Sequence, residues 1–173
     1  MIIPEYIKPG DTIAVTALSR GMEDDVEKAR FLSARSQLEA LGYKVRFTEN
    51  VFTTNDRYGR SSPASEKARQ FNELVNDPEV KAIYSAAGGD FLAEILPLID
   101  IEAFKAHPKW IQGFSDNTSI LYYLMTKGDV ATAYGANFGD FGMQPWDRSV
   151  TGGLGILEGT LKEQTSFDPY QDG

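Results

Sequence analysis

The sequence predicts a doubly wound α/β fold, in which a mostly parallel sheet carries helices on both faces. Short apolar, β-branched runs alternate with longer amphipathic runs, and turn-forming residues separate the two kinds of run. Strands that alternate with helices in this way are parallel strands joined by crossover connections. Because such crossovers are right-handed, only a few topologies remain.

The first strand and helix follow a turn near the amino terminus. Residues 12–17 (TIAVTA) come directly after Pro9-Gly10-Asp11, and their composition indicates a buried strand. Apolar residues then recur at helical spacing between Phe31 and Leu41, behind an acidic start and before Gly42. This pattern predicts one long amphipathic helix.

The same alternation continues as far as residue 134. We expect four further strands, at residues 43–48, 80–85, 110–114 and 130–134. Three helices are expected between these strands. One begins at Ser62-Pro63, one covers residues 91–99 with a break at Pro97, and one covers residues 117–127. The prediction is therefore one five-stranded α/β unit.

The alternation stops after residue 135. A loop rich in Gly, Asn and Phe precedes Val150, Leu154, Leu157 and Leu161, which are spaced as one amphipathic helix. Aromatic residues at 138–146 fit a cleft wall, a subunit contact or ordinary core packing. We expect an α/β domain over residues 1–146, and a terminal helix with the start of a linker over residues 147–173.

Composition narrows the classes of function. A net charge of -8 disfavours binding to nucleic acid and to anionic lipid. The absence of cysteine excludes disulfides, thiolate metal sites and a cysteine nucleophile. No apolar run has the length of a membrane span or a signal segment. We expect a cytoplasmic protein without membrane or nucleic-acid partners.

One strand end carries a pattern suited to nucleophilic catalysis. Binding groups gather where parallel strands end, because backbone amides and helix dipoles point outward there. Residues 113–118 (GFSDNT) join the fourth expected strand to a polar helix start. Ser115 at such a turn fits a nucleophile elbow, with the amide of Asp116 beside the oxyanion that forms on attack.

A second strand end offers another amide. Gly88-Gly89 follows the third expected strand, and residues without side chains let the backbone approach a carbonyl closely. Other roles remain open, because Ser115 and Asn117 are also ordinary helix caps and Gly-Gly is an ordinary turn. The spacing Gly-x-Ser-Asp also lacks the second glycine of the usual elbow.

Several runs together resemble one known family. They are residues 8–17, residues 77–85 leading into Gly88-Gly89, residues 96–100, and residues 107–118 followed by Tyr134-Gly135. In this order they resemble the LD-carboxypeptidase family, which includes the microcin C self-immunity peptidases. The resemblance implies a serine peptidase without metal or cofactor, acting on a small peptide: an L,D-linked murein tetrapeptide or a peptidyl-nucleotide antibiotic.

The resemblance also implies roles for single residues. Ser115 matches the family nucleophile, and Gly88, Gly89 and the amide of Asp116 match the positions around the oxyanion. After the double glycine the family usually carries an aromatic or Asn-type residue that belongs to the substrate site. This chain has Asp90 and Phe91 there, so the substrate contacts at this point stay open.

None of the residues that carry the resemblance is the general base that a serine nucleophile needs. The family supplies a His with a Glu partner from a carboxy-terminal domain, and no residues of this chain match them. His107 precedes residues 110–114 and Ser115 follows them, so a strand rise of about 3.3 Å per residue separates the two by roughly 15 Å. The carboxylates of Asp90 and Asp116 suit the orientation of a substrate amine but are poor bases. We expect His107 to be a surface turn residue beside Pro108, and the chain alone to have negligible turnover.

A non-catalytic alternative remains. A flavodoxin-like module would bind a small ligand at the switch point of the sheet, with Gly113 and Ser115 cradling it. Residues 18–21 (LSRG) lack the glycine spacing of a dinucleotide site. The truncated-enzyme hypothesis instead predicts an exposed apolar patch where a second domain packs, and a homodimer is the expected assembly.

Overall fold

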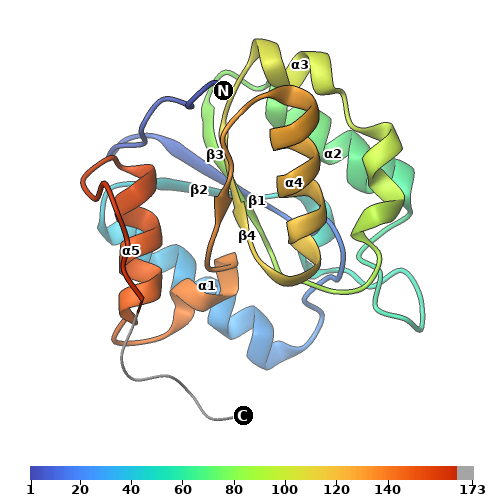
Figure 1. Ribbon diagram of the computed structural model, residues 1–173. Coiled ribbons are helices and arrows are strands. Elements are labelled where there is room, and N and C mark those ends of the chain that lie inside the picture. The colour runs from blue at the N-terminus through green and yellow to red at the C-terminus, as the bar shows by residue number, and fades with distance from the viewer. Residues whose placement is uncertain (167–173) are drawn as a thin grey trace.

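A computed structural model describes residues 1–166 (Figure 1). Its five strands are β1 (Thr12–Thr16), β2 (Lys44–Phe47), β3 (Val80–Ser85), β4 (Trp110–Gly113) and β5 (Ala133–Tyr134). They form one sheet in the order β2-β1-β3-β4-β5, and every neighbouring pair is parallel. The predicted doubly wound α/β fold is confirmed. Because the order reverses between β1 and β3, the carboxyl ends of these strands are the switch point where such sheets bind ligands.

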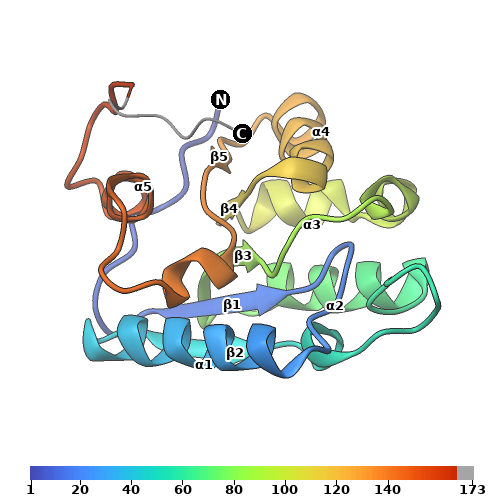
Figure 2. The same ribbon diagram turned by 90° about the horizontal axis from the view of Figure 1, so that it is seen from below.

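Helices cover both faces of the sheet. One layer contains α1 (Asp25–Ala40) and α5 (Arg148–Leu157), and the other contains α2 (Ala64–Asn76), α3 (Ile101–Ala106) and α4 (Thr118–Gly128). Figure 2 shows α5 on one side of the strands and α3 and α4 on the other. Alternate residues of β1 divide between the two cores: Ile13 and Val15 face α1 and α5, whereas Ala14 faces α2 and α4.

Local signals explain where the first helices begin and end. The Asp24 carboxylate accepts the backbone N–H groups of Val26 and Glu27, which caps α1. Gly42, with a φ of 94°, turns the chain after that helix, as its position predicts. Pro63 is the cap of α2, so this helix starts one residue later than expected.

Other elements differ from the sequence prediction. The helix expected over residues 91–99 is a 3₁₀ helix, η2 (Leu92–Leu98), which contains Pro97; the unpredicted α3 follows it behind an Asp100 cap. β5 is shorter than expected because Val130 instead bridges Ile2 of the amino-terminal segment. α5 ends at Leu157, and Gly159 turns the chain with a φ of 69°, so Leu161 lies outside the helix. The aromatic loop contains the 3₁₀ helix η4 (Phe138–Gly142).

The last helix, α5, packs on the same core as the sheet. Val150, Leu154 and Leu157 of α5 are buried with Phe138 and Phe141 of η4. The predicted linker extends into residues 167–173, which lie outside the described residues, and the boundary at residue 146 stays a prediction. No helix among the described residues has the length and apolar character needed to cross a bilayer.

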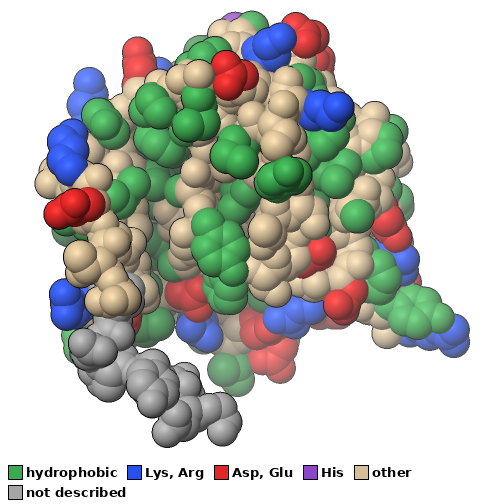
Figure 3. Space-filling view, in the orientation of Figure 1, with side chains coloured by type: hydrophobic (Ala, Val, Ile, Leu, Met, Phe, Trp, Pro, Cys, Tyr) green, Lys and Arg blue, Asp and Glu red, His purple; other side chains and the backbone are tan. Residues whose placement is uncertain are grey.

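Exposed apolar side chains gather beside the last strand of the sheet (Figure 3). On α4, Tyr122 and Met125 are 65% and 39% exposed, and Tyr134 of β5 is 69% exposed. β5 pairs only with β4, so its other edge is free among residues 1–166. We call Tyr122, Met125 and Tyr134 the α4–β5 face.

Candidate active site

Ser115 lies at the strand-to-helix junction that the sequence predicts. It directly follows β4 and Phe114, and it begins the 3₁₀ turn η3 (Ser115–Asn117) that leads into α4. Its φ of 64° lies in the left-handed region, which costs a residue with a Cβ about 1–3 kcal/mol. The residue is exposed. A strained, exposed serine between a strand and a helix has the geometry of a nucleophile elbow.

The double-glycine turn packs directly against this serine. A Cβ on Gly88 would lie 3.0 Å from both Cβ and Oγ of Ser115 and 3.6 Å from the backbone nitrogen of Asp116. Gly89 has a φ of 153°, and a Cβ there would lie 2.3 Å from Oγ of Ser19. A side chain at position 88 would crowd Ser115, and one at position 89 would collide with Ser19, so the two glycines let the turn approach both serines closely.

Asp116 uses its side chain to hold these segments together. Its carboxylate accepts the Ser19 hydroxyl at 2.6 Å and the Leu92 N–H at 2.9 Å, and Oγ of Ser19 accepts the Phe91 N–H at 3.1 Å. The loop after β1, the segment after Gly89 and the Ser115 turn are thereby linked. Asp90 is exposed and its side chain takes no part in this network.

Two buried asparagines brace the other side of the turn. The Asn117 amide group donates to the carbonyls of Ala87 and Phe114 at 3.1 Å each and to Oδ1 of Asn137 at 3.0 Å. Oδ1 of Asn137 also accepts the Phe114 N–H at 3.1 Å. The Asn117 side chain thus joins loops instead of capping α4. Sequence reasoning missed Asn137, whose only local signal is the capping box that it forms with Asp140.

The described residues bring no base to Ser115. His107, the single histidine of the chain, is exposed at the end of α3 and precedes β4, whereas Ser115 follows that strand. The two residues therefore lie at opposite ends of β4, as the sequence predicts. Within residues 1–166, no three acidic or histidine side chains gather in a way that would hold a metal ion.

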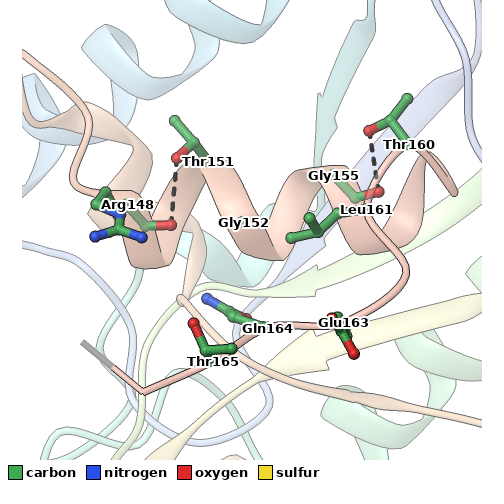
Figure 4. Close-up of a pocket in the computed structure, with 9 residues that line it drawn as sticks. All are labelled: Arg148, Thr151, Gly152, Gly155, Thr160, Leu161, Glu163, Gln164 and Thr165. Carbon is green, nitrogen blue, oxygen red and sulfur yellow. Dashed lines mark hydrogen bonds between the residues drawn. The ribbon is translucent and has the colours of Figure 1, made fainter.

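A separate cavity of about 390 Å³ lies between α5 and the segment that follows it (Figure 4). Arg148, Thr151 and Gln164 are among its lining residues. The hydroxyls of Thr151 and Thr160 donate to carbonyls of α5, so these groups are already satisfied. This cavity does not include Ser115 or the double-glycine turn.

Comparison with known proteins gives these features a context. Residues 13–135 match the LD-carboxypeptidase N-terminal domain. The microcin C7 self-immunity protein MccF of Escherichia coli is 35% identical over 137 residues, which cover 79% of this chain and 39% of that protein. A structure of MccF in the wild-type apo state has a TM-score of 0.84 and 31% identity, covering 95% of this chain and 48% of that chain.

A more distant structure shares the fold. The muramoyltetrapeptide carboxypeptidase from Oxalobacter formigenes has a TM-score of 0.70 at 21% identity, covering 84% of this chain and 47% of that chain. The chain therefore spans less than half the length of each of these relatives. Because the N-terminal domain of the LD-carboxypeptidase family matches residues 13–135, which are most of the chain, the chain belongs to this family.

Proposed function

We propose that this chain is the nucleophile-bearing half of a serine-type carboxypeptidase that hydrolyses an L,D-peptide bond. The observation that carries the proposal is Ser115 itself, held at a φ of 64° between β4 and α4 with Gly88 packed against it. A helix cap would not need a strained residue or a glycine turn in contact with its hydroxyl. A nucleophile does need both exposure and a nearby donor for the oxyanion.

The proposed reaction begins with attack of Oγ of Ser115 on the carbonyl carbon of the scissile bond. The serine proton passes to a base outside the described residues, and the carbonyl oxygen becomes an oxyanion. The amides of Gly89 and Asp116 stabilise it, and the amino-terminal end of α4 favours the same negative charge. Asp90, exposed beside Gly89, would contact the substrate.

The base belongs to the part of the family that this chain does not cover. We infer that a His and its Glu partner come from a carboxy-terminal domain, to which the linker proposed to start within residues 147–173 would lead. The exposed apolar α4–β5 face supports this inference, because such surfaces mark contacts with other domains. A cytoplasmic location and a homodimer belong to the same proposal.

Two substrate classes follow from the relatives. A mutant of MccF has been solved with adenosine monophosphate, and MccF has been solved with aspartyl sulfamoyl adenosine. The Oxalobacter relative is a muramoyltetrapeptide carboxypeptidase. We therefore propose a murein tetrapeptide or a peptidyl-nucleotide as substrate, and assays with both compounds separate them.

The direct test joins this chain to the carboxy-terminal part of MccF and compares the chimera with the chain alone. We expect the chimera to be labelled at Ser115 by a fluorophosphonate and to release D-alanine from an L,D-linked tetrapeptide, or to cleave the peptidyl-nucleotide. The chain alone should do neither, and a Ser115→Ala chimera is the control. Turnover by the chain alone would contradict the missing base. A folded chimera that is never labelled would favour the ligand-binding module.

A second test needs no added domain. The chain has no cysteine, so Ser115→Cys introduces a single thiol. A thiol at a helix start ionises below the ordinary pKa of about 8.5, so iodoacetamide should alkylate it faster than a thiol at Ser36→Cys, on the exposed side of α1. Equal rates and equal pH profiles for the two thiols would argue against an activated position.

A further inference from the structure

A small cavity beside the Ser115 turn carries charged groups that the proposed reaction does not yet use. Its volume is about 110 Å³, and Ala87, at the end of β3, forms part of its wall. Ala87 precedes Gly88, which packs against Ser115, and its carbonyl accepts the Asn117 amide. The cavity therefore adjoins the nucleophile turn and lies at the switch point between β1 and β3.

Two ion pairs line this cavity. Arg30 of α1 contacts Asp140 of η4 at 3.1 Å, and Arg20 contacts Glu27 at 2.6 Å. All four side chains are partly exposed, between 27% and 49%, so solvent and small solutes reach them. Among the described residues Arg30 makes one side-chain hydrogen bond, to Asp140, and its other N–H groups remain available to a ligand.

The two ion pairs balance each other in charge, so the cavity suits a ligand that carries one negative and one positive group. Burial raises the pKa of the Asp140 carboxyl, while Arg30 and the Asn137 N–H oppose that rise. Guanidinium groups bind carboxylates through paired N–H donors, and the two acidic side chains can accept from an ammonium group.

We propose that this cavity binds the carboxy-terminal residue of the peptide substrate, with its free carboxylate on Arg30 and Arg20. When the peptide bond breaks, the leaving nitrogen takes one proton from the base and departs as an amine. It then takes a second proton from water and becomes an ammonium group that faces Asp140 and Glu27. The small volume restricts the released residue to one of about the size of alanine. This inference rests on the proposed function, because it assigns the leaving-group side of the same reaction.

The test is a ¹⁵N NMR titration of the 173-residue chain with D-alanine, N-acetyl-D-alanine and D-alaninamide. D-Alanine should shift the amides of Ala86, Ala87 and Gly139, with a dissociation constant on the order of millimolar for so small a ligand. The acetylated compound keeps the carboxylate and should bind more weakly. The amide lacks the carboxylate and should bind least; binding as strong as that of D-alanine would overturn the proposal.

A matched pair of variants isolates the charge. Arg30→Gln should weaken D-alanine binding about tenfold, the loss expected for a charge-assisted hydrogen bond. Arg35→Gln is the control, because Arg35 lies on the same helix and pairs with Glu39 away from the cavity. Equal weakening by both variants, or shifts confined to other parts of the spectrum, would overturn the assignment.

The experiments can reject the cavity proposal and the proposed reaction independently of each other. Binding of D-alanine together with an unlabelled Ser115 in the chimera would support the cavity and contradict the proposed reaction. Labelling of Ser115 without D-alanine binding would support the reaction and reject the cavity.

Discussion

Ser19→Ala tests the network that positions the double-glycine turn. Ser19 is fully buried, and its hydroxyl both donates to the Asp116 carboxylate at 2.6 Å and accepts the Phe91 N–H at 3.1 Å. Loss of a hydrogen bond to a charged group costs about 1.5–3 kcal/mol, and an ordinary one about 1 kcal/mol. Because the Asp116 carboxylate is partly solvated, we expect a total loss of roughly 2–3 kcal/mol in the free energy of unfolding.

The measurement is urea unfolding followed by tryptophan fluorescence, with Ser36→Ala as the control. Ser36 is exposed on α1, and a surface substitution of this kind changes stability by about 0.5 kcal/mol or less. Hydrogen exchange adds a local readout, since the Phe91 and Leu92 amides should lose protection in Ser19→Ala. A Ser19→Ala variant as stable as Ser36→Ala, with both amides still protected, would refute the role given to this network.

Three further predictions follow from the same geometry. Gly88→Ala places a Cβ 3.0 Å from Oγ of Ser115, so it should abolish fluorophosphonate labelling of the chimera and cost about 1–3 kcal/mol in urea unfolding. Ser115→Gly should be about 1 kcal/mol more stable than Ser115→Ala by thermal unfolding, because glycine adopts a φ of 64° without strain; equal stabilities would argue against a strained elbow. Burial raises the pKa of the Asp140 carboxyl, so the folded state binds the carboxyl proton more tightly than the unfolded state does. The contribution of Asp140 to the free energy of unfolding therefore falls as pH rises above the ordinary aspartate pKa of about 3.9. Asp140→Asn should flatten that fall in urea titrations at successive pH values, and an unchanged slope would contradict it.

Periodicity predicted most of the fold because the strands are short, buried and separated by clear turn signals. The expected strand at residues 80–85 agrees with β3, and Gly42 ends α1 as predicted. The errors have local causes. Val130 was expected in the last strand but instead forms an isolated bridge with Ile2. This contact joins distant parts of the chain, so no local sequence pattern predicts it.

The candidate site was only partly visible in the sequence for the same reason. Ser115 and Gly88-Gly89 stand out through local turn patterns. Ser19 does not, because its partner Asp116 is 97 residues away, and Asn137 joins Asn117 across 20 residues. Side chains that hold a turn in place act through contacts between separate strands, and only the folded sheet brings those strands together.

The same sheet geometry indicates the side from which a base would reach Ser115. Tyr134 is paired with Gly113, two residues before Ser115, and Phe114, which lies between Gly113 and Ser115, is 39% exposed. Phe114 therefore lies next to Ser115 in the chain, and Tyr134, on the edge strand β5, lies beside the end of β4 that leads to Ser115. A domain seated on the α4–β5 face would place its own residues next to the serine. Tyr134→Ser should leave the chain's stability within about 0.5 kcal/mol, because the side chain is exposed, yet lower fluorophosphonate labelling of the chimera. Leu32→Ser, an exposed position on α1, is the control, and an equal loss of labelling in both variants would place the second domain elsewhere.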